Sequence, residues 1–249
     1  MAPTKEWNRS DLIPPVYSNK TLTTPLFLEE ASRLDGLLAD IDVAGIGKLM
    51  KISADLASET VRVLKARREG ELPEKAAFLS YGGTSFKSMD PESLSGPALE
   101  YGQRRVRILS GRYGILRPLD GIVPYRLEMN TPLNVPWGGE VRLKAFWKER
   151  LAPVLREESV LINLASGEYS RAVDAKAVGL RMITLHFKEK TDTGGLRTVG
   201  MYAKQARGRM VRELMDRQIE EVEAIKAIGF EGYCFDGEAS GADDWVFSR

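Results

Sequence analysis

Six arginines stand close together in the middle of the chain, and the only acid in the same stretch is Asp120. They are Arg104, Arg105, Arg107, Arg112, Arg117 and Arg126. A planar guanidinium group pairs well with phosphate and carboxylate, so this stretch suits anion chemistry. The short apolar run 106–109 has the length of a buried strand, and the glycines and prolines after it predict a rigid loop. We predict an anion site formed by Arg112, Arg117 and Arg126, because α/β proteins present binding groups on such loops. The alternative is a surface connection whose arginines pair with acids elsewhere.

A second basic cluster falls on the first turns of a long helix expected over residues 204–228, which follows a strand expected over 198–203. Its members are Lys204, Arg207, Arg209 and Arg212. Cations at the start of a helix are unfavourable next to the positive end of the helix dipole. A bound anion would offset this repulsion, so the arrangement suggests an anion site. Gly208 costs about 1 kcal/mol relative to alanine inside a helix, which suggests close packing or close approach of a ligand. The alternative is a solvated basic face.

A tight connection over residues 42–47 has the Gly-apolar-Gly pattern of a helix-hairpin-helix element. Gly45 and Gly47 would let the backbone approach a phosphate, whose charge the free N–H groups of the next helix would bind. Lys48 and Lys51 would add Coulomb attraction one turn later. The alternative is an ordinary pair of helices in which Gly45 ends the first one and no ligand is bound.

The composition limits the classes of function. The chain has 249 residues, 43% hydrophobic and 29% charged, with a net charge of +1, so any basic surface must arise from local asymmetry. The chain has one histidine, His186, and one cysteine, Cys234, which excludes a His/Cys metal cluster and an internal disulfide. A chain without an internal disulfide fits a reducing cytosol. We expect no cofactor. We expect Cys234 to be a packed thiol, because it stands between two aromatic residues. No apolar run approaches the ~20 residues of a membrane span, so we expect a cytoplasmic protein without membrane association.

The periodicity predicts one mixed α/β (α+β) domain over residues 1–249, with a central mixed sheet flanked by helices. Residues 1–11 are polar and are expected to be loosely ordered. Among the expected elements are helices over 26–41, 48–57, 58–68 and 140–155, a β–α–β crossover over 76–109, and a buried strand over 160–165. Asn163, Ser166 and Glu168 follow that buried strand. We expect these side chains to share a polar cleft with the arginine-rich loop.

Several segments resemble the YaaA family of bacterial peroxide-stress-resistance proteins. They are the central signature 109–120 with 124–129, and the segments 162–169, 202–208 and 229–236. The resemblance implies a mixed α/β domain, DNA binding and a role in limiting iron-driven oxidative DNA damage. Family members usually begin with an apolar strand that leads to Ser-Pro-Ala-Lys-Thr-Leu. Here Lys20-Thr21-Leu22 are kept, but Pro14-Pro15 interrupts the strand.

Two functional hypotheses follow. The leading one is a DNA-binding protein that contacts the phosphates of double-stranded DNA without sequence preference, because backbone contacts carry no base information. Its expected contacts are Gly45, Gly47, Lys48, Lys51, Arg112, Arg117, Arg126, Lys204, Arg207 and Arg209. The alternative is an enzyme acting on a nucleotide-like small molecule, a nucleobase or damaged DNA. A lysine among arginines has a depressed pKa and can act as a base or a Schiff-base nucleophile; the candidates are Lys20, Tyr125, Glu128 and Lys204.

Overall fold

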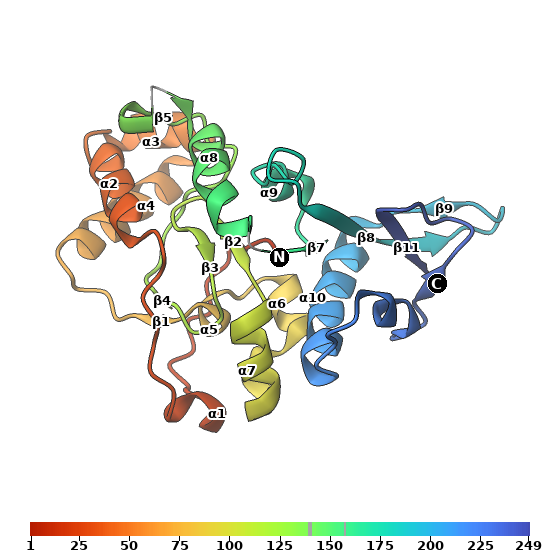
Figure 1. Ribbon diagram of the computed structural model, residues 1–249. Coiled ribbons are helices and arrows are strands. Elements are labelled where there is room, and N and C mark those ends of the chain that lie inside the picture. The colour runs from red at the N-terminus through yellow and green to blue at the C-terminus, as the bar shows by residue number, and fades with distance from the viewer. Residues whose placement is uncertain (139–140, 157) are drawn as a thin grey trace.

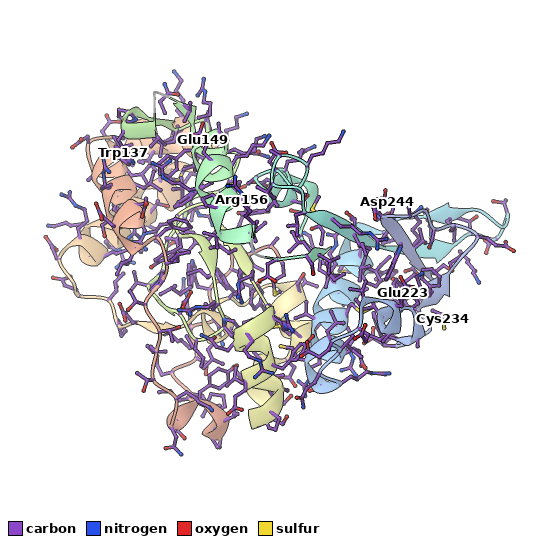
Figure 2. The ribbon with its side chains drawn as sticks, viewed as in Figure 1. Trp137, Glu149, Arg156, Glu223, Cys234 and Asp244 are labelled. Carbon is purple, nitrogen blue, oxygen red and sulfur yellow. The ribbon has the colours of Figure 1, made fainter. Side chains whose placement is uncertain are left out.

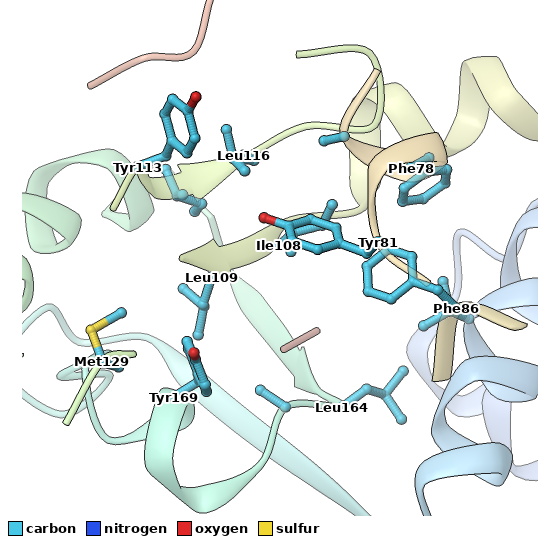
Figure 3. Packing of buried hydrophobic residues seen from close by; sticks show 14 of the residues in the cluster. Phe78, Tyr81, Phe86, Ile108, Leu109, Tyr113, Leu116, Met129, Leu164 and Tyr169 are labelled. Carbon is cyan, nitrogen blue, oxygen red and sulfur yellow. The ribbon is translucent and has the colours of Figure 1, made fainter. Parts of the chain in front are cut away.

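The computed structural model describes residues 1–138, 141–156 and 158–249 (Figure 1). It is a mixed α/β structure, as predicted. One connected cluster of buried side chains runs from Tyr17 near the start to Phe247 near the end. Figure 3 shows part of this core, where Tyr81, Phe86 and Tyr169 pack around the segment that carries the central signature.

Three helices form the N-terminal part of the fold (Figure 1): α2 (Leu28–Ala39), α3 (Val43–Met50) and α4 (Ala54–Arg68). The Asp42 side chain accepts a hydrogen bond from the Gly45 amide and caps α3, and Ser53 caps α4 in the same way through Leu56. An aspartate or serine at this position satisfies amides that the helix itself leaves free. The loop predicted over 42–47 is therefore wrong, because α3 begins at Val43. The helix starts predicted at 48 and 58 are also wrong, because each helix begins earlier, directly after its capping residue.

Short strands and helices connect this part to the rest of the chain. They are α1 (Pro15–Ser18), β1 (Lys75–Ala76), α5 (Ala77–Ser80), α6 (Thr84–Met89), η1 (Pro91–Ser93), α7 (Gly96–Arg105), β2 (Ile108–Ser110), β3 (Gly114–Leu116), β4 (Gly121–Ile122), β5 (Asn134–Val135), η2 (Pro136–Gly138), β6 (Val141–Arg142) and α8 (Leu143–Leu155). Strand β1 pairs with β4, and β2 pairs with β3 in an antiparallel hairpin. The predicted β–α–β crossover is therefore wrong, because the two strands that should have been parallel neighbours each pair with a different, antiparallel strand. Pro14-Pro15 begins helix α1 instead of interrupting a strand, since proline is well tolerated in a first helical turn.

A five-stranded mixed sheet forms the C-terminal part. Its strands are β7 (Val160–Asn163), β8 (Arg181–Lys190), β9 (Leu196–Arg197), β10 (Cys234–Asp236) and β11 (Asp244–Ser248). The order is β10-β11-β8-β7, with β9 also paired to β8; β8 is parallel to β7 and β11, and the other pairs are antiparallel. The short helices α9 (Gly167–Ser170) and η3 (Val222–Ala227) lie in the connections. Cys234 is exposed on this sheet, so its predicted burial is wrong (Figure 2).

Helix α10 (Gly200–Asp216) joins the two parts by packing against both α6 and β8 (Figure 1). Residues 200–203 of the strand predicted over 198–203 form its first turn instead. Gly208 makes the contact with α6 possible, since a Cβ at this position would lie 1.9 Å from the Ser85 carbonyl oxygen. The Ser85 hydroxyl also donates a hydrogen bond of 2.9 Å to the Lys204 carbonyl. Gly208 therefore serves helix packing, and this packing sets the position of the basic cluster on α10.

The N-terminal residues are tied to the body of the molecule, so the expectation of a loosely ordered segment is wrong for residues 1–8. The Leu109 amide donates to the Met1 carbonyl, and the Asn8 amide donates to the Ser80 carbonyl. Trp7 stacks on Tyr81 with 5.2 Å between ring centroids. These contacts stretch residues 1–8 across the molecule as a fixed strap.

We expect Gly208→Ala to lower the free energy of unfolding by about 1–3 kcal/mol, because the added methyl group overpacks the contact between α10 and α6. Urea denaturation measures this loss. The matched control is Gly36→Ala in α2, where a Cβ meets no atom within 4 Å; there the substitution should be neutral or stabilising. Equal effects of the two substitutions would contradict the packing role of Gly208.

Candidate functional site

A polar pocket of about 390 Å³ lies between the N-terminal strap, the start of α10, the loop after Tyr125 and the segment that follows β7. We call it the signature pocket. Its charged lining residues are Lys5, Glu6, Arg126, Glu128, Glu168, Lys204 and Arg207. Three of the segments that predicted a family resemblance therefore meet here, from distant parts of the sequence.

Local structure explains how each segment reaches the pocket. The Trp7 indole donates a hydrogen bond of 3.0 Å to the Tyr125 carbonyl, which holds the chain just before Arg126. A turn closed by the Thr131 amide on the Glu128 carbonyl positions Glu128. After β7, the Asn163 side chain accepts from the Ala165 amide at 3.0 Å and turns the chain toward Ser166 and Glu168.

One wall of the signature pocket is basic, and we call Arg126, Lys204 and Arg207 the basic wall. Within the described part of the chain, none of these three side chains makes a hydrogen bond or an ion pair. The Nε of Arg207 is buried without a partner, and burial lowers the pKa of its guanidinium group. A buried donor without a partner costs about 1–3 kcal/mol, so Arg207 is held in this position at an energetic cost.

The pocket also contains carboxylates. Glu128 forms an ion pair with Lys5 at 2.7 Å, and Glu168 accepts a hydrogen bond from the Asn130 amide at 3.3 Å. Lys5 was missed in the sequence analysis, although a signal was present. Pro3 and Lys5 have the same spacing as the proline and lysine in Ser-Pro-Ala-Lys.

Lys20, the predicted lysine nucleophile, does not line the pocket. Its ammonium group pairs with Glu100 of α7 at 2.8 Å. The residues before it form α1 and not a strand that leads into a crevice. The structure therefore brings together Arg126, Glu128 and Lys204, but not Lys20.

Two arginines of the arginine-rich loop pair with acids. This is the alternative interpretation of the loop, in which its arginines pair with acids elsewhere. Arg112 is buried and bonds both oxygens of Asp35, at 2.6 Å through Nη2 and at 3.0 Å through Nε. Arg117 bonds Asp120 at 3.1 Å. Neither lines the signature pocket: Arg112 is buried in its pairing with Asp35, whereas the partly exposed Arg117 pairs with the buried Asp120. Arg209 likewise pairs with Glu213 on its own helix at 2.8 Å.

The Tyr125 hydroxyl lies in a buried chain of hydroxyl groups, 2.7 Å from Ser110 Oγ and 2.9 Å from the Tyr81 hydroxyl. Burial raises its pKa to about 12, although these hydrogen bonds act in the opposite direction. Tyr125 is therefore protonated at neutral pH. Its hydrogen bonds to Ser110 and Tyr81 anchor the loop.

The helix-hairpin-helix element is not confirmed. Gly45 and Gly47 lie inside α3, and the Gly45 amide donates to the Asp42 carboxylate at 2.7 Å. A Cβ on Gly45 would lie 2.6 Å from the Ile41 side chain, so close packing of the cap accounts for this glycine. Lys48 and Lys51 are exposed beside it.

A second depression, of about 670 Å³, adjoins the signature pocket and shares Lys5, Glu6, Tyr125 and Arg126 with it. Its far end is lined by Ile46 and Met50 of α3 and by several side chains of α4. Together the two depressions extend from α3 and α4 to the start of α10. We use "the groove" for this combined surface.

Comparison with known proteins identifies the family of this chain. The family model described as "Peroxide stress protein YaaA" matches residues 1–239. The chain belongs to this family. A UPF0246 protein of Caulobacter vibrioides (strain NA1000 / CB15N) is 39% identical over 234 residues, which cover 92% of this chain and 91% of the relative. A UPF0246 protein of Azoarcus sp. (strain BH72) is 40% identical over 248 residues, covering 95% and 93%. One of Francisella tularensis subsp. tularensis (strain WY96-3418) is 34% identical over 250 residues, covering 97% of each.

The YaaA family match confirms the resemblance predicted from the signature segments and supports a role in the response to peroxide stress. Three of those segments contribute to one pocket: the first supplies Arg126 and Glu128, the second Ser166 and Glu168, and the third Lys204 and Arg207. Among the described residues, no helix has the length and apolar character needed to cross a membrane.

The buried pairing of Asp35 allows a test of the scaffold beneath the pocket. Burial alone would raise the pKa of Asp35, but hydrogen bonds and charges from Arg112 and Arg67 outweigh it and hold the pKa below its ordinary value. Asp35→Asn leaves two buried guanidinium groups without their counter-ion, so we expect a loss of about 3–5 kcal/mol in the free energy of unfolding at pH 7.

A lowered folded-state pKa gives stability that is present above the unfolded value of about 3.9 and is lost as the pH falls through the folded value. The unfolding free energies of the wild type and the variant, measured by urea denaturation, should therefore begin to converge below about pH 4 and meet only below the folded-state pKa of Asp35. Asp243→Asn is the control, because its exposed pair with Arg181 contributes about 0–1 kcal/mol. A difference that persists unchanged at low pH would refute the ionic role of Asp35.

Proposed function

We propose that this YaaA-family chain is a cytoplasmic DNA-binding protein that limits iron-driven damage to DNA during peroxide stress. It binds the phosphate backbone of double-stranded DNA along the groove, without sequence preference. One observation carries the proposal: Arg126, Lys204 and Arg207 lie together at one surface without ionic partners in the described part of the chain. Of the three arginines predicted for the anion site, Arg112 and Arg117 are paired with acids. Arg126 is therefore the one that the loop adds to Lys204 and Arg207.

The charge distribution suits this mode of binding. The net charge of only +1 does not make the whole surface attractive to DNA, so affinity must come from a local set of cations. Lys and Arg contacts to phosphate position a protein on the duplex but carry no base information. Lys48 and Lys51, exposed on α3, add charge near the other end of the groove. We assign no phosphate contact to the Gly45 amide, since Asp42 already accepts its proton.

The enzymatic alternative changes in one respect. Its proposed lysine, Lys20, pairs with Glu100 away from the pocket, whereas Lys5 pairs with Glu128 inside it. Any chemistry on a nucleotide would therefore use Lys5 in preference to Lys20. DNA binding needs only the basic wall and is the function that the geometry supports best.

Duplex binding is tested by fluorescence anisotropy with unrelated DNA sequences between 50 and 200 mM salt. We expect similar affinities for all of them and a linear fall of log K with log salt, with a slope of about −0.9 for each phosphate contacted. Arg207→Gln and Lys204→Gln should each weaken binding to every sequence and reduce the magnitude of the slope by about 0.9.

Arg197→Gln is the matched control, because it removes an exposed arginine from β9 at the outer end of the sheet (Figure 1). Its affinity and slope should equal those of the wild type. Strong preference for one sequence, affinity independent of salt, or equal losses for Arg197→Gln and Arg207→Gln would each refute the proposal.

A further inference from the structure

The signature pocket has features that contact with a duplex backbone does not require. It is a recess lined by both cations and carboxylates, and its volume of about 390 Å³ falls within the range of about 300–1,000 Å³ for small-molecule sites. We propose that it binds a single nucleotide, with the phosphate at the basic wall and the base at the carboxylates Glu128 and Glu168. This site does not rest on duplex binding, because a free nucleotide would fill it equally well.

The phosphate end is defined by the basic wall. Arg207 brings a guanidinium group whose buried Nε has no partner within the described chain. Lys204 lies one turn earlier on the same helix, and Arg126 comes from the signature loop. A guanidinium group binds phosphate through parallel N–H donors, whereas a lysine contributes a point charge. Three cations from two segments can thus surround the phosphate of one nucleotide.

The base end is defined by the two carboxylates. Glu168 accepts the amide of Asn130, which lies in the same turn as Glu128, so both carboxylates line the same side of the pocket. Carboxylate oxygens only accept hydrogen bonds, so they favour a base edge with N–H donors, such as an exocyclic amino group. Tyr169 and Leu164 add aromatic and apolar surface nearby, against which a base can pack.

The nucleotide can come from two sources with the same chemistry. It is either free in solution or a single nucleotide turned out of DNA, since proteins that read an extruded base hold it by hydrogen bonds and packing inside such a pocket. The adjoining depression shares Arg126 and Lys5 with the pocket, so a DNA strand in the groove would pass its opening.

Isothermal titration calorimetry on the full chain tests the site with AMP, CMP, GMP and UMP, with ribose 5-phosphate and adenosine as partial ligands. We expect the monophosphates with amino groups to bind at least tenfold more tightly than UMP and both partial ligands. Arg207→Gln should weaken AMP binding at least tenfold, and Glu168→Gln should reduce the preference for AMP over UMP. Arg197→Gln should leave all affinities unchanged, and melting temperatures establish that each variant is folded.

A second arm uses a duplex with one unpaired nucleotide and the same duplex fully paired. Tighter binding to the bulged duplex, lost in Arg207→Gln, supports the site with DNA as the source even if free nucleotides bind weakly. Equal affinity for ribose 5-phosphate and AMP would reduce the pocket to a phosphate site and overturn the proposal. Absence of binding in both arms would also overturn it. Salt-dependent duplex binding that survives such a result would show that the proposed function holds while the nucleotide site does not.

Discussion

One buried carboxylate organises the region that carries the signature. Asp35 on α2 accepts hydrogen bonds from Arg67 of α4 and from Arg112 of the loop between β2 and β3, with side chains no more than 6% exposed. Arg67 also donates to the Pro124 carbonyl at 2.7 Å, two residues before Arg126. Removing one member of such a group leaves an uncompensated charge, so the three side chains must fold together. The basic wall therefore depends on a contact that lies outside the pocket.

The arginines of the signature loop divide into two groups by their surroundings. Arg112 and Arg117 have carboxylates within hydrogen-bonding distance and hold the loop in shape. Arg126 extends into the groove, where it meets Lys204 and Arg207 from α10. In a chain whose acids and bases nearly balance, many of the cations lie next to an acid. A binding surface then arises where the fold separates a few cations from the acids.

The roles of two glycines also depend on which atoms surround them in the fold. Gly208 and Gly45 stand beside basic residues and fit a phosphate-binding pattern, yet each is needed for close packing. A side chain on Gly208 would collide with the backbone at Ser85, and one on Gly45 would collide with Ile41. A glycine permits close approach of any atom, so sequence alone does not distinguish a ligand from a neighbouring helix. In both positions the neighbour is protein. At Gly208 this contact with α6 places the basic residues of α10 at the pocket.

The sequence by itself determined the fold class, the family and the segments that form the site. Apolar periodicity and signature spacing are local properties, and the mixed α/β fold and the YaaA match agree with them. The helix start at 43 was missed because the cap by Asp42 overrides the loop pattern of Gly-Ile-Gly. The start at 54 was missed because Ser53 caps that helix. Only the tertiary structure decided that Lys5 replaces Lys20 in the pocket and that Arg112 is structural. Those outcomes depend on which distant side chains meet, and one-dimensional spacing does not encode the distance between Lys5 and Glu128 or between Arg112 and Asp35.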